Sequence, residues 1–197
     1  SAGASLKRVG IGFFLASICG LTLGALAGIG KGIGAAFRDV LEFLRPIPPI
    51  AWVPLAIVAF QSSEQSAWFI VFVGAFFPIF IQVCHAFANC PAKYLEVAKA
   101  YGASGWVTFW WVRVPAAGPE IAQGLRVGLG LAWTSVIAAE LVGVKSGLGN
   151  QLLNHSIDLY FADLIVCMMT IGFLGWLMTY FANTLERRLI TWRQVSE

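Results

Sequence analysis

Four long runs without Asp, Glu, Lys or Arg restrict the fold of this chain more than any other feature of its sequence. They cover residues 9–30, 46–63, 66–92 and 164–185. A helix needs about 20 apolar residues to cross the hydrocarbon core of a bilayer. The chain has 197 residues, of which 58% are hydrophobic and 12% charged, too few polar residues to cover several helices that are apolar on every face. The runs therefore predict an all-α polytopic membrane protein.

We expect about five spans in a single transmembrane domain that covers residues 1–197, at residues 9–30, 46–61, 66–88, 119–142 and 162–185. The second span is short and contains Pro46, Pro48, Pro49 and Pro54. Proline removes a backbone donor, and broken helices are tolerated at membrane depth only where protein or a cavity takes up the freed backbone groups. The sequence therefore predicts a broken or kinked second span.

The distribution of Lys and Arg predicts the orientation, because short cytoplasmic loops carry an excess of positive charge. One side holds ten such residues: Lys31, Arg38, Arg45, Lys93, Lys99, Arg113, Arg126, Arg187, Arg188 and Arg193. The other side holds three: Lys7, Arg8 and Lys145. We therefore expect residues 31–45, residues 89–118 and the C-terminus in the cytoplasm, and the N-terminus outside. Because the chain also begins without Met, we expect a further N-terminal span that this sequence does not include.

Charge and cysteine content argue against several other classes of protein. The net charge of +3 is small and scattered, which does not favour a nucleic acid partner. The four cysteines, Cys19, Cys84, Cys90 and Cys167, have no paired spacing and indicate neither disulfides nor a metal site. The first apolar run is too long for a signal peptide and has no cleavage pattern.

Small residues recur every four positions in two of the expected spans. One stripe contains Ala16, Gly20, Gly24, Gly28 and Gly32, and a second contains Gly124, Gly128 and Ala132. Such stripes let helix backbones approach closely in lipid. We expect close helix contacts along both stripes, within the subunit or across a dimer.

The longest polar interruption, residues 89–119, predicts a helix–turn–helix outside the membrane. Tyr94–Ala100 contains good helix formers, Gly102 breaks the helix, and a second helical stretch over 106–114 ends at Pro115. Phe109, Trp110 and Trp111 suit the boundary between membrane and water, where aromatic rings concentrate.

This segment resembles the signature of permease subunits of binding-protein-dependent ABC importers, E-A-A, three residues, G, nine residues, I-x-L-P. The matching residues are Glu96, Val97, Ala98, Gly102, Val112, Val114 and Pro115. Three of them differ from the signature: Val97 replaces its first Ala, Val112 its Ile and Val114 its Leu. The stretch 45–54 (RPIPPIAWVP) and Ala138-Ala139-Glu140-Leu141 resemble the branch for taurine, alkanesulfonate, nitrate and bicarbonate. The resemblance covers essentially the whole chain, without the first transmembrane helix of the branch.

The resemblance implies an ABC type I importer-like permease fold in a bacterial cytoplasmic (inner) membrane. The implied partners are a second permease copy, two ATP-binding cassette ATPase subunits and a soluble or lipid-anchored binding protein. The ATPase would be coupled through Glu96, Ala98, Gly102, Ala103, Ser104 and Pro115. The sequence itself lacks the phosphate loop G-x-x-x-x-G-K-[ST]. Gly30-Lys31 comes nearest, but Ala25 stands where the motif needs its first Gly, and Gly32 stands where it needs Ser or Thr. We therefore expect no catalytic residue, metal or cofactor in this chain, with ATP and Mg on the partner ATPase.

Five polar or aromatic residues in the spans are candidates for a translocation pathway: Gln82, Trp133, Thr134, Ser135 and Glu140. Each is equally suited to hydrogen bonding between helices. Glu140 is a candidate for gating an anion near the outer mouth, or a charge that extends to the membrane surface. From residues 138–141 and the end 185–189 we favour taurine or an alkanesulfonate as the substrate, with nitrate or nitrite, bicarbonate or cyanate as the alternative.

Two other classes of protein remain as alternatives. Gly102-Ala103-Ser104-Gly105 matches the G-x-S-G motif of rhomboid-like intramembrane serine proteases, whose Ser needs an activating His. The one His after it, His155, is expected in the opposite, external loop. A channel or secondary transporter usually has ionisable residues deep in a span. Here Glu120 and Glu140 lie near span ends, and His85 near the cytoplasmic end of the third span.

Overall fold

The computed structural model describes residues 1–30 and 33–189, and within them every regular element is helical. The helices are α1 Ala2–Ile29, α2 Ile33–Leu44, the 3-10 turn η1 Pro49–Trp52, α3 Val53–Ala59, α4 Ser63–Ala88, α5 Ala92–Ala100, α6 Gly105–Thr108, the π-helical turn η2 Phe109–Arg113, α7 Val114–Val142, α8 Leu148–Ile157 and α9 Phe161–Leu189. The predicted all-α class is confirmed. Four helices are long and apolar enough to cross a membrane, or five if the bent pair formed by α2 and α3 counts as one.

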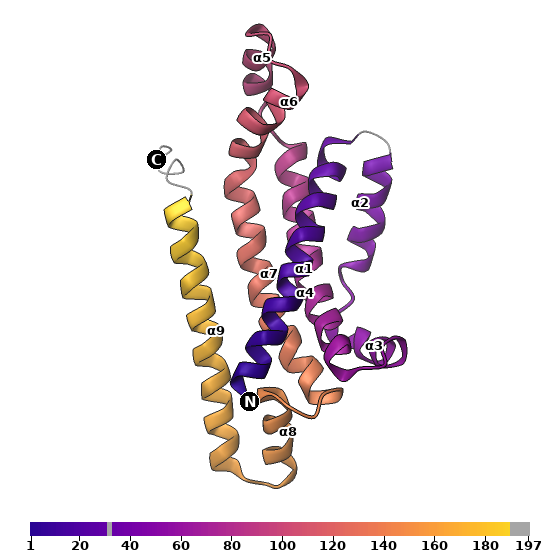
Figure 1. Ribbon diagram of the computed structural model, residues 1–197, viewed down its shortest axis with the longest axis vertical. Helices are drawn as coiled ribbons and strands as arrows, with labels where there is room; N and C mark the ends of the chain where they lie inside the picture. The colour runs from indigo at the N-terminus through magenta and orange to yellow at the C-terminus, as the bar shows by residue number, and fades with distance from the viewer. Residues whose placement is uncertain (31–32, 190–197) are drawn as a thin grey trace.

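Helix α4 is the centre of the bundle, with α1 and α7 packed against it (Figure 1). Its side chains Ile70, Ile79, Phe80 and Val83 are almost completely buried. This helix carries few polar groups and is covered on most of its circumference, as expected for an apolar helix in the interior of a bundle.

The small residues of α1 make the close contact predicted from their spacing, and they make it with α4. A Cβ atom added to Gly24 would lie 2.8 Å from Cβ of Val83 and 2.9 Å from the carbonyl oxygen of Phe80. Gly20 and Gly28 meet α4 in the same way. These contacts lie within the subunit, which decides between the two alternatives for these positions. Gly32 lies outside the described residues.

The second stripe brings α7 close to α4 as well. A Cβ on Gly128 would lie 2.7 Å from Cγ1 of Ile79, and one on Gly124 would lie 2.8 Å from Cβ of Gln82. Ala132 is completely buried. Both stripes therefore act as predicted: small side chains let three backbones approach closely where packing, and not the expulsion of water, drives association.

The second span differs from its predicted boundaries but is broken as expected. Residues 33–44 form α2 rather than a cytoplasmic loop, and the axis turns by 93° between Arg38–Leu44 and Pro49–Ala59. The predicted start of the second span, at residue 46, was wrong because the charged residues of α2 interrupt the apolar run but do not prevent a helix. Arg38 lies 3.9 Å from Glu42 along one face, and His85 of α4 lies 3.8 Å from the same carboxylate.

The expected end of a helix at Pro115 is also wrong. α6, η2 and α7 continue into one another, so that Gly105–Val142 is one candidate span of 38 residues. Pro115 is the second residue of α7 and comes directly after the π-helical turn η2. The predicted second helix of the helix–turn–helix is therefore the beginning of the fourth span.

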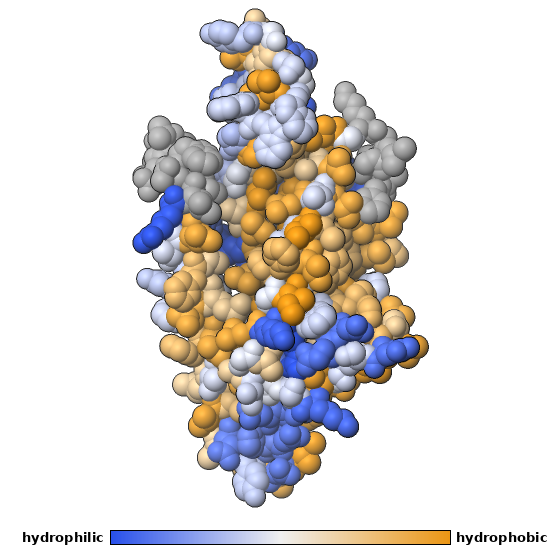
Figure 2. All heavy atoms as spheres, viewed as in Figure 1, coloured by the Kyte–Doolittle hydropathy of each residue, from blue (hydrophilic) through white to orange (hydrophobic). Residues whose placement is uncertain are grey.

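The two ends of the bundle differ in form. α5 and α6 project beyond the bundle at the end where α9 finishes, whereas the N-terminus, α3 and α8 lie at the other end (Figure 1). A band of hydrophobic residues lies between the two ends on the face shown in Figure 2. Helix α9 lies at the edge, and 6% of its most apolar window is buried within the chain.

Candidate functional site

The hairpin formed by α5, the turn at residues 101–104 and α6 has a fixed backbone shape. Gly102, predicted to break the helix, has a φ of +70°, a left-handed conformation. Its N–H donates to the carbonyl of Lys99 at 2.9 Å, and the N–H of Ala103 donates to Ala98 at 3.0 Å. This pair of bonds is a Schellman motif, which ends a helix at a residue where a side chain is disfavoured.

Ser104 caps the next helix. Its Oγ accepts a hydrogen bond from the N–H of Val107 at 3.4 Å, which satisfies one of the free donors of α6. The G-x-S-G sequence is thus explained by a left-handed Gly followed by an N-cap. His155 belongs to α8, at the opposite end of the molecule from α6 (Figure 1). The structure does not bring a serine and a histidine together here.

The hairpin presents both charged and apolar side chains. Glu96 is exposed, whereas Ala98 is 7% exposed and holds α5 against the molecule. Tyr101 is 87% exposed at the tip. Pro115 lies further along, at the start of α7. Exposed aromatic surface beside a fixed charge is typical of a protein contact.

Three of the candidates for a translocation pathway make contacts inside the helix bundle. Trp133 Nε1 donates to the carbonyl oxygen of Ile171 in α9 at 3.2 Å, and Ser135 Oγ donates to that of Leu131 at 2.6 Å. Gln82 lies at the contact of α4 with α7, opposite Gly124. These three side chains occupy contacts between helices or with their own helix.

Thr134 is the exposed member of this set. Its Oγ1 donates back to the carbonyl of Leu131 at 3.0 Å, and Val127 and Leu131 are exposed on the same side of α7. A threonine beside exposed apolar residues leaves this strip of α7 open to lipid, to a second subunit or to a channel between subunits.

Glu140 does not extend to the membrane surface, because its side chain is completely buried. It accepts a hydrogen bond from Arg8 Nη1 at 2.7 Å, a second from Ser5 Oγ at 2.9 Å and a third from the N–H of Gly149 at 2.9 Å. A buried carboxylate requires this kind of compensation, since an unpaired charge is strongly unfavourable away from water.

Arg8 is the second centre of this group, which we call the ion cluster: Ser5, Arg8, Glu64, Glu140 and Ser146. The guanidinium is 1% exposed. It donates to both carboxylate oxygens of Glu64, from Nε at 2.9 Å and from Nη2 at 2.5 Å. It also donates to Ser146, to the carbonyl oxygen at 2.8 Å and to Oγ at 2.7 Å. The ion cluster therefore joins α1, α4, α7 and the loop before α8.

Glycine in that loop makes room for the ion cluster. Gly147 has a φ of +116°, and a Cβ atom there would lie 2.2 Å from the carboxyl carbon of Glu140. A side chain at this position would have both an unfavourable backbone and a direct clash. The sequence Gly147-Leu148-Gly149 is therefore matched to the carboxylate that it covers.

Sequence reasoning did not find the ion cluster. Arg8 was assigned to the external charges, and α1 was expected to begin after it. Arg8 is separated in sequence from Glu140 by 132 positions and from Ser146 by 138 positions, so no local spacing indicates these contacts. One signal was available in the sequence. Arg8 and Glu140 have opposite charges and lie at the ends of two apolar runs on the same predicted side, and charged residues within spans usually pair with one another.

Residues 20–192 match the family described as the inner membrane component of binding-protein-dependent transport systems. The chain is also similar to curated relatives over nearly its whole length. It is 37% identical over 189 residues to the bicarbonate transport system permease protein CmpB of Synechococcus elongatus. The aligned region covers 95% of this chain and 68% of that protein. The chain is 34% identical over 187 residues to the nitrate import permease protein NrtB of Synechocystis sp., with 95% and 68% covered.

A solved structure has the same arrangement of helices. A chain of the methionine ABC transporter MetNI, in an inward-facing conformation, matches with a TM-score of 0.81 over 94% of this chain and 92% of that chain. The sequence identity is 20%, so this likeness concerns the fold.

Proposed function

Because the chain belongs to the family of inner membrane components of binding-protein-dependent transport systems, we propose that it forms the transport pathway of an ABC importer for a small inorganic anion, bicarbonate or nitrate. The family predicted from residues 96–115 is thereby confirmed. The observation that carries the proposal is the fixed turn at Gly102, which lies at the signature glycine of the family.

The preference for taurine or an alkanesulfonate has less support than its alternative. The relatives described above carry the names of bicarbonate and nitrate transport systems. The tetrapeptide 138–141 on which the preference depended includes Glu140, whose carboxylate is held by Arg8 and Ser5. A side chain fixed in this way reports how the helices are joined and gives little information about the substrate.

The family is one of transport permeases and has ATPase and binding-protein partners in general. For this chain we propose two ATPase subunits, which bind ATP and Mg and are coupled through the hairpin. The support is geometric, because a rigid turn carries a displacement of α5 into α6 and α7 without bending. Glu96 and Tyr101, both exposed, are the proposed contacts on the ATPase.

A second permease copy, most simply an identical one, is the proposed partner within the membrane. Only 6% of the most apolar window of α9 is buried in the single chain, and Thr134 lies on an exposed strip of α7. A pathway formed between two copies would use such strips, and Trp133, Ser135 and Glu140 are each held by hydrogen bonds within the chain.

We propose that the hairpin end is cytoplasmic in an inner membrane. The hairpin and the end of α9, with Arg187 and Arg188, lie at the same end of the molecule (Figure 1). A cysteine at Ser104 is expected to react with an impermeant thiol reagent from the cytoplasm only, and one at Lys145 from outside only. Lys145 is preferred to Ser146, whose Oγ accepts a hydrogen bond from Arg8. Labelling from the reverse sides would contradict the orientation.

The function is tested by uptake into proteoliposomes that contain the chain assembled with its ATPase and binding protein. Labelled bicarbonate, nitrate and taurine are compared, each with ATP and with a non-hydrolysable analogue. We expect ATP-dependent uptake of bicarbonate or nitrate and not of taurine. Uptake without ATP would support a secondary transporter, and uptake of taurine alone would restore the sulfonate assignment.

A further inference from the structure

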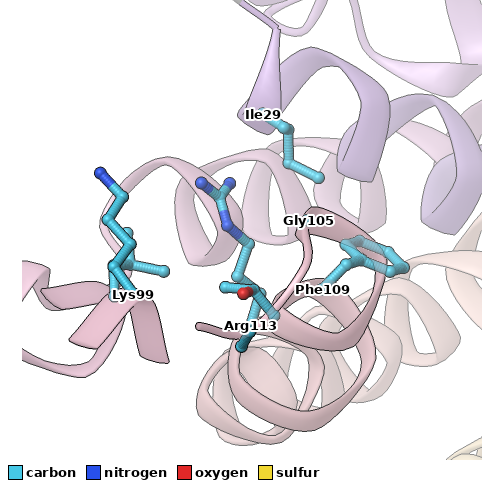
Figure 3. A pocket seen from close by; sticks show the side chains of 8 residues that line it. Ile29, Lys99, Gly105, Phe109 and Arg113 are labelled. Atoms are coloured by element: carbon cyan, nitrogen blue, oxygen red, sulfur yellow. The ribbon is translucent and has the colours of Figure 1, made fainter. Parts of the chain in front are cut away.

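A cavity lies between the end of α1 and the hairpin, and its lining contains two cations, Lys99 and Arg113. It has a volume of about 410 Å³ and is lined by Ile29, Leu95, Lys99, Ala103, Gly105, Thr108, Phe109 and Arg113. Figure 3 shows the Arg113 guanidinium extending into the space between Lys99 and Ile29. A second cavity of about 240 Å³ shares Ile29, Leu95 and Arg113 with the first and adds Arg38.

The two cations of the first cavity have no acidic partner among the residues that the structure describes. Neither Lys99 nor Arg113 takes part in any of the ion pairs or side-chain hydrogen bonds there, whereas Arg38 lies within 4 Å of two carboxylates. The acidic side chains nearest in sequence, Glu96 for Lys99 and Glu120 for Arg113, are both exposed. Arg113 is only partly exposed, so its charge is not fully solvated by water. An anion is therefore the missing counterpart.

The position of the cavity indicates the kind of anion. Trp106 and Trp110 flank it on α6 and η2, with 73% and 51% of their surfaces exposed. Such side chains concentrate at the level of the lipid headgroups. Phe109 forms one wall and stacks on Phe87 at 5.7 Å between ring centroids. The cavity thus combines two cations with apolar walls, next in sequence to exposed tryptophans.

The exposed surface next to the cavity suits an acyl chain. Leu26 and Ile29, at the end of α1, are 69% and 39% exposed. A phosphate held by Arg113 and Lys99 would leave the rest of a phospholipid free to follow this surface into the bilayer. Basic pockets between membrane helices are known to take anionic headgroups.

We propose that this cavity, beside the end of α1, binds the phosphate group of an anionic phospholipid through Lys99 of α5 and Arg113 of η2. The proposal is independent of the transported anion, because it concerns a site between the hairpin and the membrane. The bound phosphate lies between the positive charges of Arg113 and Lys99 and so fixes α5 relative to η2.

The test uses the transporter assembled with its ATPase and purified in a mild detergent. Native mass spectrometry measures the binding of added phosphatidylglycerol and phosphatidylcholine. We expect selective binding of phosphatidylglycerol, weakened about fivefold by Lys99→Gln and by Arg113→Gln, the size expected for one interfacial cation on an anionic lipid. Arg113→Lys should retain most of the binding, and Lys93→Gln, a cation of α5 outside both cavities, should change nothing.

Three results would overturn the proposal. Equal binding of phosphatidylglycerol by the wild type, Lys99→Gln and Arg113→Gln would remove the cavity as the site. Displacement of the lipid by millimolar inorganic phosphate would assign the site to a soluble anion. Loss of the ATPase from the Gln variants with unchanged lipid binding would make the two cations a protein contact. Because Lys99 is exposed, its variant remains informative if Arg113→Gln fails to fold.

Discussion

The two ends of this helical bundle treat charge in opposite ways. At the end that contains the N-terminus, Arg8 and Glu140 are buried and every polar group of the ion cluster has a partner on another element. At the hairpin end, Lys99 and Glu96 are exposed, and the close contact of α1 with α4 finishes near Gly28. One end is fixed by the chain itself, and the other has charges and apolar side chains available for partners.

This difference suits a subunit that receives a mechanical input at one end. Buried ion pairs add little net stability but strongly penalise any arrangement that separates the partners. They therefore keep α1, α4 and α7 together as one unit. The hairpin, whose contacts with the bundle are few, acquires its position from what binds it.

The largest expected effect comes from breaking the ion cluster. Glu140→Leu removes one of the two carboxylates that pair with the buried Arg8, and also the acceptor of the Gly149 N–H, so we expect a loss of about 3–5 kcal/mol in the free energy of unfolding. Glu120→Leu, on the exposed side of the same helix, is the control and should change it little. Stability is measured by denaturation in detergent. Equal stability of the two variants would mean that the ends do not differ as described.

A smaller effect is expected where the tight packing approaches the hairpin end. In Gly24→Leu the side chain meets Val83 and the carbonyl of Phe80, and overpacking of this kind costs about 1–3 kcal/mol. Assembly and folding should suffer. Gly10→Leu is matched to it on the same helix, since a Cβ there meets nothing within 4 Å. Normal assembly and transport in Gly24→Leu would show that α1 and α4 separate easily.

At the hairpin we expect a local change with a large functional consequence. Gly102→Val places a side chain at positive φ, which costs about 1–2 kcal/mol within the turn. The protein should still reach the membrane and assemble, but ATP hydrolysis should no longer be stimulated by the loaded binding protein. Gly105→Ala, which has neither a positive φ nor a close neighbour, should behave as the wild type. Stimulation of normal size in Gly102→Val, on assembled complex, would remove the hairpin from the coupling mechanism.

The smallest effect on stability is expected for Glu96→Lys. The charge is exposed, and pairs along a helix surface contribute about 0.2–0.5 kcal/mol, so unfolding should hardly change. Co-purification of the ATPase should nevertheless weaken, because the variant reverses a charge at the proposed contact. Glu120→Lys reverses an exposed charge on α7 and serves as the control. Identical recovery of the ATPase with both variants would exclude Glu96 from the interface.

The sequence alone was sufficient for features that depend on neighbours in the chain. Long apolar runs specify helices that cross a membrane, the prolines at 46–49 require a break, and glycine at 102 is suited to a left-handed turn. The spacing of four residues placed Gly20, Gly24 and Gly28 on one face. Each of these inferences rests on the conformational limits of a residue or on the pitch of a helix, which are local properties.

Only the tertiary structure decided which faces meet and which charges are neutralised. It assigned the stripe of α1 to α4, extended α7 backwards through η2, and brought Arg8 to Glu140 across 132 positions of sequence. The free energy of a buried charge depends on the groups around it, and these come from distant parts of the chain. For that reason Arg8 and Glu140 were interpreted from sequence as charges at the membrane surface, although they form the most completely paired group at their end of the protein.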